Sequence, residues 1–377
     1  MREIKNEEFR KNIYINKVIM RRMRQNYVFG LALLLWLTCS FSLVANPLEV
    51  VKKKTIERSF NVGSNDRLHV ENRYGNITVT YWNKQEVALR VEIESKARNE
   101  RRAEENLGRV RVECGKTGGV VSAITSIEPR KSGNGSHESF NIHYYIQMPG
   151  RLAAELSQKY GNIYLPDKNE GKMDIWLKYG NLKAGDFSRA VSIEAKYGNI
   201  EVGDLRDARL DLGYVGDARL GNVESLHVDS KYSDMKLKRA RSLEMEMKYG
   251  NLSVESADEL DLEIKYSKAT IGELKRSLSV GSLSYSDLRI RHLSPSFKEI
   301  DVESHYGNME VGVPATASFR IVANEMTYGR CDVKGFKKMN SKGNERERDF
   351  IYEINGGGSS TIHFDGGNYG NLKVYEL

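Results

Sequence analysis

Hydrophobic and polar residues alternate along most of this chain with a period of two. In one representative segment, Val191, Ile193 and Ala195 stand at positions −6, −4 and −2 from Tyr197. After the tyrosine, apolar residues return at +3 and +5, so the alternation slips by one position. A period of two is typical of β-strands, and we interpret the slip as a corner. The pattern therefore predicts a strand, a corner and a second strand within each short segment.

The same pattern recurs around a tyrosine tag, mostly Tyr-Gly-Asn or Tyr-Ser-Asp, in steps of 17 to 22 residues. The regular run comprises Tyr160, Tyr179, Tyr197, Tyr214, Tyr232, Tyr249, Tyr266, Tyr285, Tyr306 and Tyr328. Two further tags lie outside this run, at Tyr74 and Tyr369. Stacked segments of this kind are typical of parallel β-helices, whose neighbouring coils lie about 4.8 Å apart. The sequence therefore predicts an all-β, single-chain parallel β-helix (β-solenoid) of about 12 coils.

The tyrosine column admits two interpretations. The tyrosines share the parity of Ile193, Met247 and Leu177, which favours an inward, structural ladder of stacked rings in the core. In the alternative, the rings form a surface row that stacks against sugars. Asn or Asp at +2 suits a turn, and its side chains can form a ladder from coil to coil. We predict the buried ladder.

The outward positions form two charged columns. Position −3 is acidic at Glu71, Glu194, Asp211, Asp229, Glu246, Glu263, Glu303 and Glu325. Position −1 is basic, and its candidate exposed binding stripe comprises Lys159, Lys178, Lys196, Lys231, Lys248 and Lys265. Neighbouring columns of opposite charge offset the repulsion within each column, so the simpler interpretation of the lysines is structural. The functional alternative is a cationic stripe that grips an anionic polymer.

The period breaks between Tyr74 and Tyr160. Residues 96–107 read as one short polar helix, whereas 120–127 and 140–148 alternate as strands of a hairpin-like block. Because the open end of a solenoid exposes unpaired strand edges, this block is suited to cap the first coils. We expect three parts: a leader at 1–45, the first coils with the helix and cap-like strands at 46–150, and the continuing solenoid of the same domain at 151–377.

The N-terminus carries an export signal. Arg21, Arg22 and Arg24 precede the apolar run 28–37, which predicts a signal peptide with cleavage after Ala45. Polar interruptions after the run disfavour a retained membrane anchor. The expected location is exported: periplasm, outer membrane or cell surface.

Other features of the leader leave alternatives open. Lipidation of Cys39 is one, although the residues before it match the lipoprotein pattern poorly. Leu43 is large for its position before the predicted cleavage site, so the site can shift by a few residues. Translation can also start at Met20 or Met23.

The net charge, the cysteines and the histidines limit the classes of function that this chain can have. Residues 1–45 hold 8 of the 58 Lys and Arg residues and 3 of the 51 Asp and Glu residues. The remaining 50 basic and 48 acidic residues give only +2, too little for the basic footprint of nucleic-acid binding. Cys114 and Cys331 read as buried structural thiols, and the seven histidines show no metal-ligand spacing. We therefore predict no catalytic residues, no cofactor, no metal and no nucleic-acid partner.

A family resemblance rests on short motifs across about residues 50–377. These are the leader, a charged helix, a strand ending at Met148-Pro149, serial Lys-Tyr-Gly-Asn coils, and the segments 354–358 and 369–374. Together they resemble the putative-adhesin family of exported bacterial β-strand-repeat proteins, a domain of unknown function. The resemblance implies a β-helical exported protein and brings no catalytic residues.

The predicted function is a non-catalytic envelope or surface binding protein, similar to an adhesin. Its expected partner is an envelope polysaccharide or another envelope protein, reached through one long face of the solenoid. One alternative is a β-helical polysaccharide lyase or hydrolase, an enzyme class that gathers carboxylates at one break in the repeat. Another is an accessory scaffold in envelope stress or signalling.

Overall fold

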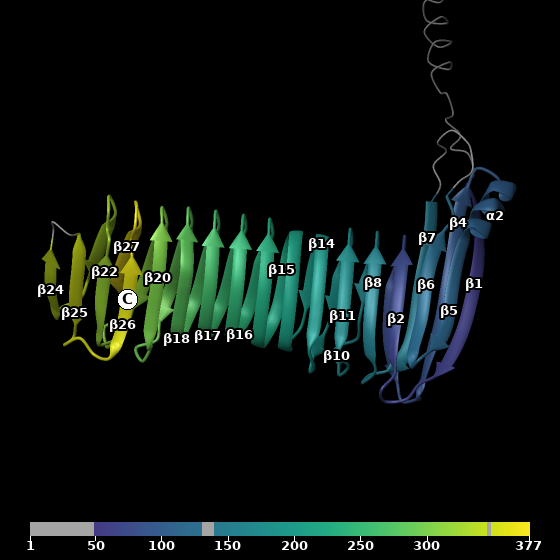
Figure 1. Ribbon diagram of the computed structural model, residues 1–377, viewed down its shortest axis with the longest axis horizontal. Helices are drawn as coiled ribbons and strands as arrows, with labels where there is room; N and C mark the ends of the chain where they lie inside the picture. Colours follow the sequence, from purple (N-terminus) through teal and green to yellow (C-terminus); the bar gives the residue numbers. More distant parts are fainter. Residues whose placement is uncertain (1–48, 130–138, 345–347) are drawn as a thin grey trace, which may run out of the picture. The chain divides into compact units, whose positions relative to one another are not determined.

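The described residues fold into an all-β structure with one helix. The computed structural model describes residues 49–129, 139–344 and 348–377, of which Val50–Leu377 forms one compact unit. Its 27 strands belong to one open, mixed sheet, seen side by side in Figure 1. The predicted signal peptide, Cys39 and Ala45 lie outside the described residues. Within those residues, no helix has the length and apolarity needed to span a membrane.

The N-terminal part combines parallel and antiparallel pairing. Its elements are β1 (Val50–Asn61), β2 (Arg67–Arg73), β3 (Ile77–Trp82), β4 (Glu86–Ala97), α2 (Glu100–Arg109), β5 (Val110–Thr117), β6 (Val120–Ile127) and β7 (Ser139–Pro149). Strands β1, β4 and β7 pair antiparallel, as do β5 and β6. The strands predicted at 120–127 and 140–148 are confirmed as β6 and β7.

The helix begins later than predicted. Residues 96 and 97 still belong to β4, and Asn99 caps the helix because its side chain accepts the backbone N–H of Arg102 at 3.0 Å. The polar helix is therefore present, shifted by a few residues toward the C-terminus. Packing of its buried residues Ala103 and Asn106 leaves its charged residues toward solvent.

The central part is a run of parallel strands. It contains β8 (Ala153–Lys159), β9 (Ile163–Tyr164), β10 (Lys168–Asn169), β11 (Met173–Lys178), β12 (Leu182–Ala184), β13 (Asp186–Phe187), β14 (Val191–Val202), β15 (Leu205–Lys231), β16 (Met235–Lys248), β17 (Asn251–Lys265), β18 (Lys268–Ser284), β19 (Asp287–Leu293), β20 (Glu299–His305) and β21 (Asn308–Val313). Each repeat pairs in parallel with the next, position by position, as in Lys178 with Lys196 and Lys248 with Lys265. The sequence repeat is thus a structural repeat.

The C-terminal strands do not follow chain order. They are β22 (Phe319–Asn324), β23 (Arg330–Lys334), β24 (Met339–Asn344), β25 (Asp349–Ile354), β26 (Ser360–Asp365) and β27 (Asn371–Glu376). Strand β26 lies between β20 and β22, and β27 lies between β21 and β23, all parallel. Strands β22, β25 and β24 pair antiparallel. The sheet is therefore mixed and not purely parallel: antiparallel pairs occur in the N-terminal part, where a hairpin-like block was predicted, and also at the C-terminal end, where the sequence predicted parallel coils.

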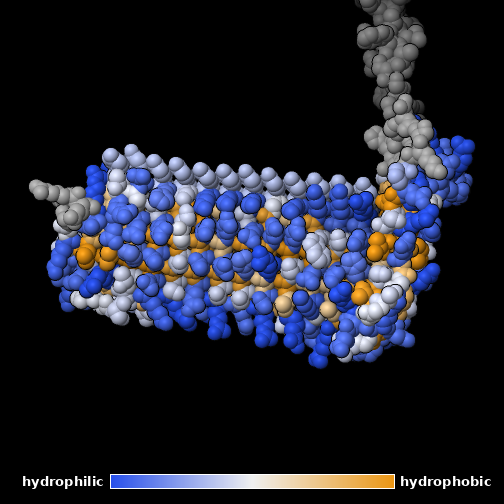
Figure 2. Space-filling model, in the orientation of Figure 1, coloured by the Kyte–Doolittle hydropathy of each residue, from blue (hydrophilic) through white to orange (hydrophobic). Residues whose placement is uncertain are grey.

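The core is a set of apolar columns that run across the strands. Ile175, Ile193 and Leu210 lie opposite one another on β11, β14 and β15, and each is at most 1% exposed. Toward the C-terminal end, Phe297, Phe319 and other large side chains fill the interior. Side chains of similar hydropathy also form rows on the surface, perpendicular to the strands (Figure 2). Burial of the inward-facing apolar side chains of these strands is the main contribution to the stability of the fold.

The corner after each tyrosine brings two backbones into close contact. Gly161 N–H donates to the Tyr179 carbonyl, and Gly180 N–H donates to the Tyr197 carbonyl, both at 3.2 Å. A Cβ at Gly180 would lie 1.8 Å from the Gly161 carbonyl oxygen, so this corner excludes a side chain. Glycine is required here by the stacking of repeats.

Serine serves the same corner in a different way. Val215 N–H donates to Ser233 Oγ at 2.9 Å, and Ser233 Oγ donates to the Lys231 carbonyl at 2.9 Å. Ser286 likewise accepts from Ser267 N–H at 3.0 Å. The hydroxyl replaces the tyrosine carbonyl as acceptor, which explains why both Tyr-Gly and Tyr-Ser tags occur.

The close approach at Gly180 gives a stability prediction. Gly180→Ala should lower the free energy of unfolding by about 1–3 kcal/mol, since the neighbouring repeat must move away from the added methyl group. Gly281→Ala is the matched control, because no atom lies within 4 Å of the added Cβ and the expected change is within about 0.5 kcal/mol. Denaturant unfolding measures both, and equal stability of the two variants contradicts the close packing.

Candidate functional site

The tyrosine ladder lies on the surface, contrary to the prediction of a core ladder. The ladder comprises the ten tyrosines of the regular run together with Tyr74 and Tyr369. All twelve have φ between 49° and 60°, and their exposure ranges from 40% for Tyr179 to 64% for Tyr328. A left-handed backbone turns the side chain away from the face occupied by the preceding inward residues. The parity rule failed because it assumes an extended backbone at the tyrosine.

The twelve rings form one unbroken stack. Neighbouring ring centroids lie 4.8–5.2 Å apart, with interplanar angles of 4–21°. Tyr369 stands between Tyr306 and Tyr328, which follows from the insertion of β26 and β27 between earlier strands. Each inner ring thus has both faces covered by its neighbours, and solvent meets the ring edges and the hydroxyls.

This geometry limits what the ladder can bind. A sugar cannot lie against the covered face of an inner ring, so face stacking of the kind considered for a surface row is excluded there. In the described part of the chain, none of the twelve hydroxyls makes a hydrogen bond to protein, whereas the buried Tyr144 hydroxyl contacts Thr125 Oγ1 at 2.6 Å. The ladder therefore presents a row of unoccupied donors and acceptors at regular intervals.

The candidate lysine stripe flanks the ladder. Lys159, Lys178 and Lys196 occupy equivalent positions in adjacent repeats, and so do Lys231, Lys248 and Lys265. Gly213 interrupts the stripe between these two groups. Backbone register therefore places the six lysines in two runs of three.

Three lysines of the stripe form ion pairs along their own strands. Lys196 Nζ donates to Glu194 at 2.7 Å, Lys265 Nζ lies 3.5 Å from Glu263, and Lys248 pairs with Glu246. The hydrogen bond to Glu194 raises the pKa of Lys196, and the bond from Lys248 lowers the pKa of the Glu246 carboxyl against an opposing desolvation effect. Exposed pairs of this kind contribute little net stability, but they offset the charge of the stripe.

The first two lysines of the stripe differ from the others. The acidic position −3 is occupied by Ser157 before Lys159 and by Trp176 before Lys178. These two ammonium groups lie close to the adjacent Tyr160 and Tyr179 rings, at 5.0 and 5.3 Å from the ring centroids. At the N-terminal end of the stripe the ammonium groups thus lie beside the ladder rings, whereas Lys196, Lys248 and Lys265 pair with carboxylates.

An Asn/Asp column follows the ladder on its other side. Asn181 N–H donates to Asn162 Oδ1 at 2.8 Å, and Asn199 N–H donates to Asn181 Oδ1 at 2.9 Å. Asn251 N–H similarly donates to Asp234 Oδ1 at 2.9 Å. The expected ladder of turn side chains is confirmed. A shallow groove runs between this column and the tyrosines, lined by Tyr232, Tyr249, Tyr266, Tyr285, Asp234, Asn251 and Lys268.

The remaining candidate groups are structural in character. Cys114 and Cys331 are unpaired and partly buried, and burial raises the pKa of both thiols, that of Cys331 to about 12. A thiol with a raised pKa is a poor nucleophile at neutral pH. In residues 49–129, 139–344 and 348–377, no three His, Cys, Asp or Glu side chains are arranged to hold a metal ion.

Comparison with known proteins gives only distant similarity. No family model and no curated protein matches the chain. A solved "putative cell adhesion protein" from Clostridium sporogenes is 11% identical, covering 87% of this chain and 100% of its own, with a TM-score of 0.20. A "putative adhesin" from Parabacteroides distasonis is 9% identical over 86% and 97%, with a TM-score of 0.33.

A third similar structure has a different description. It is a "putative lipid binding protein" from Parabacteroides distasonis, 14% identical over 70% of this chain and 95% of its own, with a TM-score of 0.27. TM-scores this low carry no argument about function, which is therefore argued from the geometry of the chain itself.

Tyr249 provides a test of the surface ladder. Tyr249→Ala loses two stacked pairs, so we expect a cost of about 1–3 kcal/mol in unfolding free energy. Tyr249→Gly loses the same pairs but relieves the left-handed backbone, so it should be about 1 kcal/mol more stable than the alanine variant. Chemical denaturation of both variants measures the difference.

The control site is Ser253, which is exposed on a strand with no left-handed backbone. There the order should reverse, with Ser253→Gly about 0.5–1 kcal/mol less stable than Ser253→Ala. A loss of about 3–5 kcal/mol for Tyr249→Ala, the cost of truncating a core aromatic residue, contradicts the surface position.

Proposed function

We propose that this chain is an exported, non-catalytic envelope binding protein whose tyrosine ladder holds a linear polysaccharide. In this proposal, Val50–Leu377 is a β-solenoid, and its role is to present the ladder as one long straight edge. The observation that carries the proposal is the unbroken stack of twelve exposed rings whose hydroxyls are free of protein partners in the described residues.

The spacing of the rings favours a sugar polymer over an extended peptide. Ring centroids recur every 4.8–5.2 Å, whereas an extended peptide advances about 3.3–3.4 Å per residue and loses register after a few residues. A linear glycan carries hydroxyls on every unit and matches a repeated hydroxyl row. Because stacking already fixes the rings, binding loses little side-chain entropy, which favours affinity.

The flanking columns complete the edge. The stripe of Lys159, Lys178, Lys196, Lys231, Lys248 and Lys265 lies on one side, and the Asn/Asp column lies on the other. Because Lys196, Lys248 and Lys265 are paired with carboxylates, half of the six lysines supply hydrogen-bond donors and little net charge. An uncharged or weakly charged polysaccharide therefore suits this edge better than a polyanion.

Export follows from the leader and not from the fold. Arg21, Arg22 and Arg24 before the apolar run 28–37 support delivery to the periplasm, the outer membrane or the cell surface. An envelope polysaccharide is the hydroxyl-rich linear polymer available in each of these places.

The test removes hydroxyls without disturbing the stack. The triple variant Tyr232→Phe, Tyr249→Phe, Tyr266→Phe keeps the rings, so its melting temperature should stay that of the wild type. Its affinity for cello-oligosaccharides of increasing length, and for polysaccharide purified from the bacterial envelope, should fall about tenfold or more. Isothermal titration calorimetry measures both series.

Length dependence and a control variant complete this test. Wild-type affinity should rise with oligosaccharide length, since a longer chain spans more rings of the ladder. Tyr145→Phe removes an exposed hydroxyl away from the ladder and should bind as the wild type does. Normal binding by the triple variant, or affinity independent of length, rules out the ladder as the binding edge.

A further inference from the structure

A second surface feature lies at the corner where each repeat passes to the next, away from the tyrosine tags. Two hollows adjoin there and share Asp186, Ser188 and Arg206 in their linings. Together they form one groove, here called the arginine groove, which runs from the starts of β2 and β8 across β10 and β13 to the start and middle of β15 and the middle of β16. Its lining contains eight basic and five acidic residues, a net of +3, whereas all residues after 45 sum to +2.

Two of the five carboxylates are already paired with cations. Asp66 lies 2.7 Å from Lys116 Nζ and also accepts the Gly63 N–H, and together these hold the pKa of its carboxyl below the usual value. Glu170 accepts from Arg151 Nε at 2.9 Å. These two acids therefore do little to offset the remaining cations of the groove.

Two more carboxylates are committed to joining the repeats. Asp186 Oδ1 accepts the Asp204 N–H at 2.8 Å, and Asp204 Oδ1 accepts the Asn222 N–H at 2.7 Å. Asn222 Nδ2 also donates to both oxygens of Asp204, at 3.0 and 3.1 Å. Each of these acids thus satisfies backbone N–H groups of the next repeat.

Most cations of the groove have no carboxylate partner within the described part of the protein. Five exposed side chains have no ion-pair partner within the described ranges: Lys168, Lys172, Arg189, Arg206 and Arg241. Three lining carboxylates also have no ion-pair partner there, namely Asp186, Asp204 and Glu224, and of these Glu224 alone accepts no hydrogen bond. Arginine presents a planar fork of donors that matches carboxylate geometry, so these groups are equipped for an external anion.

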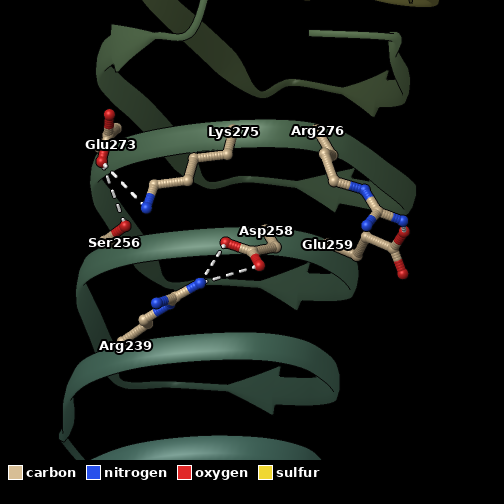
Figure 3. A network of polar contacts seen from close by, with 7 residues as sticks. All are labelled: Arg239, Ser256, Asp258, Glu259, Glu273, Lys275 and Arg276. Carbon is tan, nitrogen blue, oxygen red and sulfur yellow. Dashed lines mark hydrogen bonds and ion pairs between the residues drawn. The ribbon is translucent and has the colours of Figure 1, made fainter.

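At the same corner further along the chain, cations are paired with carboxylates of the protein. Figure 3 shows Arg239 directed toward Asp258, Lys275 toward Glu273, and Arg276 beside Glu259. Arg239 Nη2 lies 3.1 Å from Asp258, and Lys275 Nζ lies 3.8 Å from Glu273. Since the backbone arrangement is equivalent, ion pairing at this corner depends on which side chains occupy it: Arg239, Lys275 and Arg276 are paired, whereas Arg189 and Arg206 are not paired with any described residue.

We propose that the arginine groove binds a linear glycan that bears carboxylates. The groove extends across successive repeats, so a polymer with a charge on each unit can meet Arg189, Arg206 and Lys172 in turn. Its lining has one aromatic residue, the buried Phe187, so the stacking platform of single-stranded nucleic-acid sites is missing from it. The groove is distinct from the tyrosine ladder, and the two proposals stand or fall separately.

The test compares matched charge removals on one corner. The variant Arg189→Gln, Arg206→Gln and the control Lys275→Gln, Arg276→Gln each remove two positive charges from exposed positions of the same kind. The probe is polygalacturonate, which carries one carboxylate per sugar, and the probe control is its methyl ester. Affinities are measured by calorimetry at low and at physiological salt.

The expected pattern is specific to the groove. Wild-type protein binds polygalacturonate and not its methyl ester, and the Arg189/Arg206 variant loses about tenfold in affinity per arginine. The Lys275/Arg276 variant stays within about twofold of the wild type, because its cations are already paired. The Tyr232/Tyr249/Tyr266 phenylalanine variant also binds polygalacturonate normally, which separates the groove from the ladder.

Three results overturn the proposal. One is the absence of polygalacturonate binding by the wild type at low salt. Another is an equal loss in the Lys275/Arg276 control, which indicates diffuse attraction by net charge. The third is loss of binding in the phenylalanine variant, which assigns the anion to the ladder.

Discussion

The structure depends on backbone hydrogen bonds that keep equivalent positions of neighbouring repeats together through the corner as well as along the strands. Tyr160 N–H donates to the Lys178 carbonyl and Tyr179 N–H donates to the Lys196 carbonyl, both at 2.9 Å. The register therefore continues through a residue whose backbone is left-handed. Because this geometry recurs, side chains at equivalent positions lie over one another except at local register shifts such as that after Gly198, and columns of like residues follow.

That constraint accounts for the choice of tyrosine at the corner. A left-handed backbone costs a non-glycine residue about 1–2 kcal/mol, and all twelve tyrosines of the ladder adopt it. Each ring stacks on its neighbours at 4.8–5.2 Å, and aromatic pairs contribute about 0.5–1.5 kcal/mol each, a stabilisation of the same order as the cost. The ladder thus offsets strain within the fold and at the same time places a row of hydroxyls in solvent.

The two long surfaces differ in how their charges are used. Along the ladder, Lys196, Lys248 and Lys265 are paired with glutamates of their own strands, so the charge of these three lysines is offset within the protein. In the arginine groove Asp186 and Asp204 accept hydrogen bonds from the next repeat, and five of the lining cations have no ion-pair partner among the described residues. A repeat fold can therefore carry two surfaces of different chemistry, since each column is free to vary without changing the backbone.

The sequence by itself determined the repeat, the all-β class, the parallel register of the central strands and the Asn/Asp ladder. Alternation with period two and the recurring tag suffice to predict these features, because each repeat pairs with the next one along the chain. It also identified β6, β7 and the existence of α2. The lysine stripe was found as a column, but its ion pairs depend on which residue occupies position −3, as Ser157 and Trp176 illustrate.

Only the tertiary structure decided where the tyrosines point, how the ends are built and which cations lack partners. The parity of Ile193 and Tyr197 is the same in sequence, yet a positive φ at the tyrosine reverses its direction, and no local pattern reports that angle. The insertion of β26 and β27 between earlier strands is a long-range pairing that chain order hides. In the sequence, Arg189 and Arg206 look like ordinary surface residues. The nearby Asp186 and Asp204 accept hydrogen bonds from the following repeat instead of pairing with these arginines, and only the structure shows this.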